Sequence, residues 1–344
     1  MTLECLVCSL PDKIILANEI FICNEENYND FVYKERIYVD SNGICNKCSH
    51  YQKIFNPNDL KKQIKAFTNL KTSPKAEYDA IVAYSGGKDS TVTLYLAKEI
   101  LGMNVMAYTL DNGFIPEEVQ KRSQLICEQL KIPLVTIRDD IYKDFLDNYH
   151  YDQENQKWFT ETKKDLCSNC SRKIFSNLEK LLAKHRINRV ITGLNTYLKL
   201  HQHRISAINK IYYYSDDHQK KHYWHLALPY AMQINITKQQ EILKKVSWYE
   251  INFKGYTSNC LIPGFTEGFC SSKDGYSFDT AYLAKEKRSG YFANAEKLFT
   301  DFREPKIMSA TDHQAITDFF KNKHIDPLRP SHPQNQDILG NFER

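Results

Sequence analysis

The chain has 344 residues, long enough for about two domains, and 42% of them are hydrophobic, which supports a sizeable core. The formal net charge of +4 is mild: it permits nucleic-acid binding without arguing for it. No apolar stretch approaches the ~20 residues that span a bilayer, and the N-terminus lacks the basic and apolar regions of a signal peptide. We therefore expect a cytoplasmic protein that does not enter a membrane.

Residues 1–52 hold half of the ten cysteines and little helical pattern. Two Cys-x2-Cys pairs frame this part, Cys5 with Cys8 and Cys45 with Cys48. Four thiolates satisfy a tetrahedral Zn²⁺ ion, and a reducing compartment disfavours disulfides. The spacing predicts a zinc-ribbon-like domain with a structural metal, and buried free thiols are the alternative.

The linker that follows, 53–76, contains one amphipathic helix over 58–70, which Asn58 or Asp59 can cap. Strands and helices then alternate. The predicted strands are 80–84, 104–110, 134–137 and 189–192, and the predicted helices are 90–101, 116–130 and 171–185. Such alternation is typical of a doubly wound parallel sheet, so we predict an α/β domain over 77–262.

Beyond residue 195 the pattern loosens, and a C-terminal helical region and tail are expected over 263–344. The elements expected in this half are strands at 211–214 and 223–228 and helices at 237–246, with Thr237 as N-cap, 279–287 and 313–321.

One turn, between the strand at 80–84 and the next helix, concentrates the chemistry. It consists of Ser85, Gly86, Gly87, Lys88, Asp89 and Ser90. A glycine pair there exposes several backbone N–H groups in a concave turn, and the helix N-terminus adds partial positive charge. The lysine adds a full charge, and both serines can donate to phosphate oxygens. The spacing excludes the Walker pattern, so a phosphate-binding loop of another kind is predicted, at a strand end where ligands of such sheets bind.

Other polar residues follow neighbouring strands. Asp111 ends the second strand, where it can contact the nucleotide or cap a turn. Gly193 ends the fourth strand, where the absence of a side chain would admit the nucleotide. The basic group after it can bind leaving pyrophosphate or form a solvated face; it comprises Lys199, His201, His203 and Arg204.

A further pair, Cys167-x2-Cys170, lies in the polar insertion before the fourth strand, which places it near the phosphate loop. Two thiolates are too few for a closed cluster, and Cys260 is the obvious third ligand, with Cys270 as its substitute or as a fourth. Three cysteine ligands would leave the fourth iron of a [4Fe–4S] cluster open to bind a sulfide. A second zinc site and an inert pair are the alternatives.

The turn resembles the PP-loop, S-G-G-x-D-S, of the ATP pyrophosphatase superfamily, whose members split ATP between the α and β phosphates and adenylate a carbonyl oxygen. The resemblance implies an adenine nucleotide alpha hydrolase-like fold. Residues 78–262 are similar to the 2-thiouridine and 2-thiocytidine tRNA sulfur transferases, through the loop, CSNCSR at 167–172, Leu228-Pro229 and Cys260. That family holds a [4Fe–4S] cluster on a C-x2-C pair and a distant cysteine, which implies Cys167, Cys170 and Cys260 here.

The N-terminal part resembles the N-acetyl sugar amidotransferases, through the first Cys-x2-Cys pair, Pro11-Asp12 and GICNKC at 43–48. Those enzymes also carry the PP-loop, but they install nitrogen supplied by a partner glutaminase.

Together the resemblances imply an enzyme that uses ATP and Mg²⁺ to adenylate a nucleobase carbonyl, in tRNA or as a small molecule, and then replaces the oxygen with sulfur from a donor or carrier. The expected catalytic residues are Lys88, Asp89, Cys167 and Cys260. An amidotransferase acting on an N-acetyl sugar and a nucleic-acid-binding adaptor without activity are the alternatives. A homodimer is compatible with the sequence.

Overall fold

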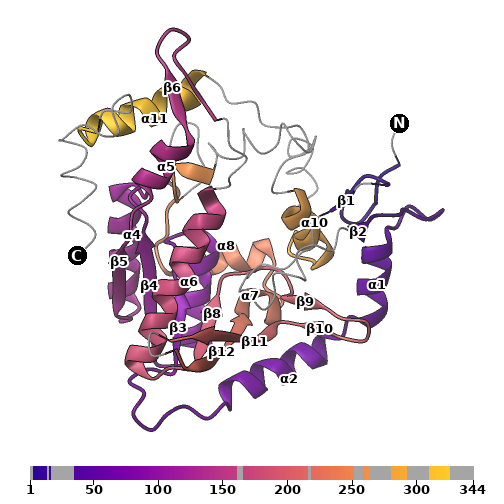
Figure 1. Cartoon of the computed structure of the whole chain (residues 1–344). Coiled ribbons are helices and arrows are strands. Elements are labelled where there is room, and N and C mark those ends of the chain that lie inside the picture. Colours follow the sequence, from indigo (N-terminus) through magenta and orange to yellow (C-terminus); the bar gives the residue numbers. More distant parts are fainter. Residues whose placement is uncertain are drawn as a thin grey trace.

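Figure 1 shows the computed structural model of the chain. Cys270 lies outside the described residues. The structure describes residues 3–13, 15–16, 35–160, 166–215, 218–251, 259–263, 280–292 and 310–325.

The centre of the molecule is a six-stranded sheet in the order β11-β12-β8-β3-β4-β5. All of its neighbouring strands run parallel except β11, which is antiparallel to β12. In sheet order the strands are Ile208–Tyr214, Lys220–Ala227, Arg189–Thr192, Ala80–Ala83, Val105–Asp111 and Leu134–Arg138. The predicted doubly wound α/β fold is confirmed, because apolar strands such as β3 and β8 are buried on both faces.

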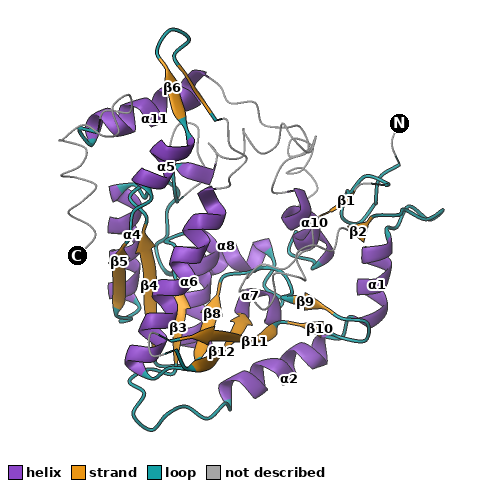
Figure 2. Ribbon diagram, in the orientation of Figure 1, coloured by secondary structure: helices purple, strands orange, loops and turns teal. Residues whose placement is uncertain are grey.

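Helices cover both faces of this sheet (Figures 1 and 2). One face packs against α6 through leucines such as Leu178 and Leu182. The other packs against α2, α3, α4, α7 and α8, with Phe67, Val92 and Ile126 among the buried contacts. The helices are α2 (Pro57–Thr68), α3 (Lys88–Tyr95), α4 (Glu117–Gln129), α6 (Leu166–His185), α7 (Leu228–Ala231) and α8 (Ile236–Lys245).

Several helix starts differ from those expected. The helix expected at 171–185 begins five residues earlier, so both cysteines of the third Cys-x2-Cys pair lie in its first two turns and not in a loop before it. Asn56 caps α2 and Asn235 caps α8, in place of Asn58 or Asp59 and of Thr237, because their side-chain oxygens accept bonds from backbone N–H groups of the first turn. After α3 the helix continues as a π-helical turn, η2 (Leu96–Ile100).

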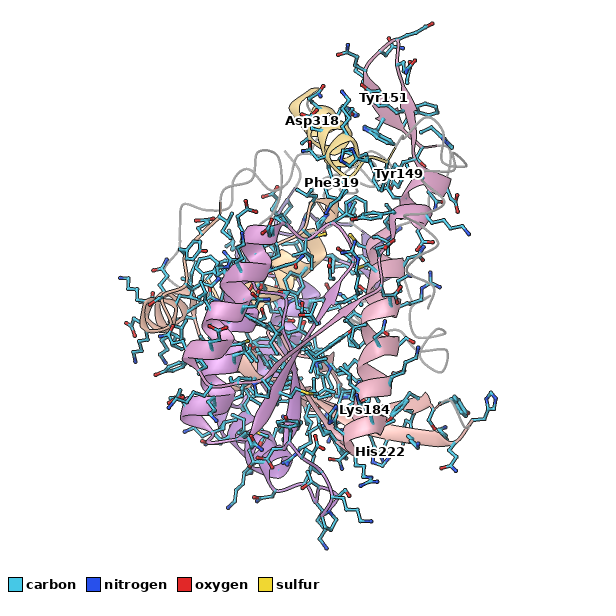
Figure 3. All side chains as sticks on the ribbon, turned by 90° about the vertical axis from the view of Figure 1, so that its left-hand side faces the viewer. Tyr149, Tyr151, Lys184, His222, Asp318 and Phe319 are labelled. Carbon is cyan, nitrogen blue, oxygen red and sulfur yellow. The ribbon has the colours of Figure 1, made fainter. Side chains whose placement is uncertain are left out.

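The polar insertion before α6 folds into elements that the pattern did not predict. It contains α5 (Tyr142–Asn148) and a hairpin of β6 (His150–Asp152) and β7 (Lys157–Phe159). These pack with α11 (Ala310–Asn322) into an aromatic cluster at one end of the molecule, where Figure 3 shows Tyr149 and Phe319.

The N-terminal part contains β1 (Ile15–Leu16), β2 (Glu35–Arg36) and α1 (Asn46–Ile54). It contacts α10 (Thr280–Arg288), from the C-terminal region, through Ala284. A short hairpin of β9 (Lys199–Leu200) and β10 (Ile205–Ser206) leaves the sheet between β8 and β11.

The aromatic cluster provides a test of the packing between α11 and the insertion. Phe320 is fully buried, and its ring lies 5.2 Å from that of Phe145 and 5.7 Å from that of Trp158. We expect Phe320→Ala to lower the free energy of unfolding by about 3–5 kcal/mol, because it leaves a cavity among rings. Phe159→Ala is the matched control, since that ring is 43% exposed. Equal midpoints of chemical denaturation for the two variants would contradict this packing.

Candidate active site

The predicted phosphate loop follows β3 and ends in the first turn of α3. Gly87 precedes the helix, so the first N–H groups of α3 have no helical partner. The Ser90 hydroxyl donates to the Gly87 carbonyl oxygen at 3.1 Å, and the Ser85 backbone N–H donates to the Ser90 hydroxyl oxygen at 3.2 Å. These bonds brace a turn that can receive an anion.

Close contacts explain why the loop needs two glycines. Gly86 has a φ of +76°, and a Cβ there would lie 2.3 Å from Oγ of Ser123 on α4. A Cβ at Gly87 would lie 2.2 Å from Nδ2 of Asn259, and the same Asn259 amide donates to the Ser85 hydroxyl at 3.3 Å. The loop is thus held between α4 and Asn259.

Arg122, on α4, is a buried cation behind the loop that the sequence analysis missed. Its Nη2 donates to the Gly86 carbonyl oxygen at 2.8 Å, and its Nη1 donates to the Tyr249 carbonyl oxygen at 2.6 Å. The Trp248 ring lies 4.8 Å from the guanidinium, and its Nε1 donates to the same Gly86 oxygen at 3.3 Å. In sequence Arg122 reads as a surface residue of an amphipathic helix; only the fold brings it under the loop.

The carboxylate of Asp89 is held by three donors. Its Oδ1 accepts bonds from Asn195 Nδ2 at 2.9 Å, Gln239 Nε2 at 2.6 Å and the Tyr291 hydroxyl at 3.3 Å. The donors follow β8, lie on α8 and follow α10. Gly193 serves the same junction, because a Cβ there would lie 2.8 Å from backbone atoms of the first turn of α3. The absence of a side chain at Gly193 therefore makes room for the first turn of α3.

Asp111 and Asn112, at the end of β4, shape a turn. Oδ1 of Asp111 accepts a bond from the Gly113 N–H at 3.0 Å, and its Oδ2 lies 3.5 Å from the Arg138 guanidinium. The structure shows Asp111 capping a turn, and its contact with the nucleotide stays a prediction. The next residue, Asn112, donates from Nδ2 to a cysteine sulfur on α6, which places β4 beside the thiols.

Of the three cysteines predicted to hold a cluster, Cys170 and Cys260 come together. Cys167 and Cys170 lie on the first two turns of α6, and Cys260 comes from a segment far along the chain. The Asn112 amide donates to the sulfur of Cys170 at 3.3 Å and to that of Cys260 at 3.5 Å. All three cysteine residues are half-buried and pack against the aromatic cluster. Burial raises the pKa of Cys260 to about 11 and also raises that of Cys170.

The N-terminal cysteines also come together. The sulfurs of Cys5, Cys8, Cys45 and Cys48 all lie within 4.8 Å of one another, and all four residues are buried. The Cys8 and Cys45 sulfurs are 3.6 Å apart, close to the ~3.8 Å edge of a tetrahedron around a zinc ion. Two backbone N–H groups donate to sulfurs of this group, as expected where thiolates bind a metal. The predicted four-cysteine centre is confirmed as a preformed site.

Arg288, on α10, contacts this centre from outside. Its Nε lies 3.5 Å from the Cys48 sulfur and its Nη2 lies 3.9 Å from that of Cys8. A third nitrogen donates to the Tyr197 hydroxyl at 2.6 Å. The guanidinium thus places positive charge beside thiols and ties the centre to the segment that follows β8.

The basic group after β8 does not line the phosphate loop. Lys199, His201 and Arg204 belong to the β9–β10 hairpin and line a groove whose walls are α2, the hairpin, β11 and β12. The expected contact with leaving pyrophosphate is therefore not supported by their place in the fold.

Comparison with known proteins agrees with the loop geometry. Residues 60–194 match the NAD synthase family. This range contains the loop and the strands β3, β4, β5 and β8. The predicted resemblance to PP-loop proteins is confirmed for this central part of the chain.

Two proteins of Methanocaldococcus jannaschii are similar in sequence, and neither has an assigned activity. Uncharacterized protein MJ1599 is 24% identical over 280 residues, which cover 80% of this chain and 90% of that protein. Uncharacterized protein MJ0066 is 29% identical over 90 residues, which cover 26% of this chain and 19% of that protein.

Two solved structures are also similar. The NH3-dependent NAD synthetase of Campylobacter jejuni is 20% identical with a TM-score of 0.28; the match covers 41% of this chain and 55% of the synthetase, so the chain spans about half of that protein. The U34-tRNA thiolase NcsA of Methanococcus maripaludis, solved with its [4Fe-4S] cluster, is 14% identical with a TM-score of 0.36 over 91% of this chain and 96% of that protein.

Within the described part of the chain, none of the helices combines the length and the apolar character that crossing a bilayer requires.

A second carboxylate lies beside the PP-loop aspartate. Glu286, on α10, is 5% exposed, and its Oε1 accepts a bond from the same Asn195 amide at 3.2 Å. Burial, and then repulsion from Asp89, raise the pKa of Glu286 to about 7. α10 therefore contacts the four-cysteine centre through Arg288 and reaches the PP-loop through Glu286.

The raised pKa of Glu286 predicts a pH effect on stability. Between pH 4.5 and about 7 the unfolded chain releases a proton that the folded chain keeps, so stability falls as pH rises through this window. We expect the unfolding free energy of the wild type, relative to Glu286→Gln, to fall by about 3 kcal/mol from pH 4.5 to pH 8. Parallel pH profiles of chemical denaturation for the two proteins would contradict the assigned environment of Glu286.

Proposed function

We propose that the chain is an ATP-dependent sulfur transferase that adenylates the carbonyl oxygen of a nucleobase and replaces it with sulfur. One observation supports this proposal: Cys260, one of the three proposed cluster ligands, directly follows a residue that contacts the PP-loop. Asn259 contacts the loop at Ser85, and the residue that follows it, Cys260, shares the Asn112 amide with Cys170. Two consecutive residues thus contact the two sites: Asn259 contacts the phosphate loop, and Cys260 belongs to the group of thiols.

The PP-loop supplies the first half of the reaction. The free N–H groups of the first turn of α3 and the charge of Lys88 hold the phosphates, and Mg²⁺ bound partly by these phosphates offsets their charge. The substrate carbonyl oxygen attacks the α phosphorus, the bond to the bridging oxygen breaks, and pyrophosphate leaves. Asp89 is fixed by its three donors, so it holds the start of α3 in place while charge develops.

The cysteine trio of Cys167, Cys170 and Cys260 supplies the second half. Its three sulfurs would hold a [4Fe–4S] cluster: Asn112 donates to two of them, and all three half-buried residues pack against the aromatic cluster. Such a cluster on three thiolates has one iron without a protein ligand, which can hold sulfide. A sulfide equivalent from a donor or carrier protein attacks the adenylated carbon, AMP leaves with the oxygen, and a thiocarbonyl results.

The four-cysteine centre has a structural part in this proposal. Its buried sulfurs suit Zn²⁺, which would hold the N-terminal segment closed. We place domain limits at 1–52 for this ribbon, 53–76 for the linker, 77–262 for the PP-loop domain and 263–344 for the C-terminal region. A reducing compartment such as the cytoplasm suits the free thiols and the proposed donor.

Lys88 tests the PP-loop. We expect Lys88→Ala to reduce AMP formation from labelled ATP about 100- to 1,000-fold, in the presence of sulfide and unmodified tRNA, because a cation is lost where negative charge develops. Lys98→Ala, further along the same helical run, is the matched control and should keep wild-type rates. Wild-type turnover in Lys88→Ala would refute the loop assignment, and RNA binding without AMP release in the wild type would favour an adaptor.

Cys260 distinguishes sulfur transfer from nitrogen transfer. We expect the protein, reconstituted with iron and sulfide without oxygen, to bind about four irons per chain and turn brown. Cys260→Ala should lose the iron and the colour but keep its zinc, because the four-cysteine centre is separate. Cys127→Ala, at a buried cysteine of α4, is the control and should retain the iron. A colourless wild type that holds only zinc would favour an ammonia-dependent amidotransferase.

A further inference from the structure

A polar groove opens beside the edge of the sheet, away from the PP-loop. It encloses about 570 Å³. Its walls come from α2, the β9–β10 hairpin, β11 and β12, and Figure 1 shows the hairpin to the right of the sheet with α2 beneath it. The lining residues that carry charge or an aromatic ring are Asp59, Lys62, Lys199, His201, Arg204, Lys210 and Trp224.

The charge of this groove is positive. Lysines and an arginine come from α2, from the hairpin and from β11, and the acidic member, Asp59, is 3.5 Å from Lys62. Burial, and then the charges of Arg204 and Lys199, lower the pKa of His201. On β12, burial and then Lys210 lower the pKa of His222, which Figure 3 shows near the edge of the sheet. The positive charges of the groove therefore lower the pKa values of nearby histidines, and one carboxylate, Asp59, does not neutralise them all.

Hydrogen bonds fix the distance between the walls of the groove. Gln63 joins α2 to the hairpin, since its Nε2 donates to the Ile205 carbonyl oxygen and its Oε1 accepts from the Ala207 N–H, both at 2.8 Å. The His50 ring lies 2.9 Å from the His201 carbonyl oxygen and holds the other end. A groove held in this way needs little rearrangement to receive a ligand.

The far wall adds an aromatic surface. Trp224 is partly exposed, and the ammonium of Lys210 lies 5.8 Å from its ring and 5.0 Å from the ring of Tyr212. Cations spaced along a groove, together with a ring that can stack, form the combination that binds a nucleic-acid backbone and an unpaired base.

The groove is linked to the reaction site through the chain. Asn195 donates to Asp89 of the PP-loop, and the hairpin begins four residues later, at Lys199. The groove and the carboxyl end of β8, where the loop lies, are thus joined by a short stretch of chain.

We propose that this groove binds the phosphate backbone of an RNA substrate, with Lys199 and Arg204 as the main phosphate contacts. The proposal rests on the proposed function and specifies its acceptor as a nucleobase within RNA. The cations come from three separate elements along the groove, which suits a chain of phosphates better than one phosphate group.

The test compares two double variants with the same change in charge. We expect Lys199→Glu/Arg204→Glu to weaken binding of an unmodified tRNA transcript at least about tenfold and to lower the slope of log affinity against log salt by about 1.5. Lys121→Glu/Lys143→Glu, on α4 and α5, should stay within about twofold of the wild type. Lys199→Gln/Arg204→Gln removes the two positive charges without adding negative ones, and it should also weaken binding. Circular dichroism spectra equal to that of the wild type exclude a folding defect in each variant.

Equal tRNA affinity of the groove and control variants would overturn the proposal, as would a wild type that binds no RNA. In both cases the Lys88 measurement, repeated with a free nucleobase as the acceptor, and the Cys260 measurement still decide sulfur transfer. Conversely, Lys88→Ala should bind the transcript with wild-type affinity.

Discussion

The hydrogen bonds to the Asp89 carboxylate are the constraint on which the site depends. This carboxylate lies in the first turn of α3, next to the phosphate-binding turn, so hydrogen-bond donors must hold it in one position. Here Asn195, Gln239 and Tyr291 reach one oxygen of Asp89 from three different parts of the chain. Gly193 allows this junction, since any side chain there would collide with the first turn of α3.

The junction connects the loop with both groups of cysteines. On one side, Asn259 rests on Gly87 and is followed by Cys260, which lies with Cys170 around the Asn112 amide. On the other side, α10 brings Glu286 to Asn195 and Arg288 to the N-terminal thiols. Burial of Glu286 next to Asp89 costs free energy above neutral pH, and the same helix contacts the four-cysteine centre through Arg288.

Local patterns predicted much of this structure. The alternation of apolar strands and amphipathic helices predicted the parallel sheet, and the loop motif predicted its turn at the end of β3. The spacing of Cys5, Cys8, Cys45 and Cys48 predicted a site that the fold forms. The hairpin β6–β7 and the caps at Asn56 and Asn235 were not predicted, because short strands and caps depend on single contacts that periodicity does not record.

The residues around the loop show where local pattern ends. Strand apolarity, glycine spacing and thiol pairs act over a few residues, so the sequence alone was sufficient to predict the sheet, the phosphate turn and the candidate metal ligands. Arg122, Gln239, Glu286 and Tyr291 carry no such pattern, and they reach the loop only because α4, α8 and α10 pack around it. Contacts between distant segments are settled by packing, and so the surroundings of Asp89 and the basic groove became visible only in three dimensions.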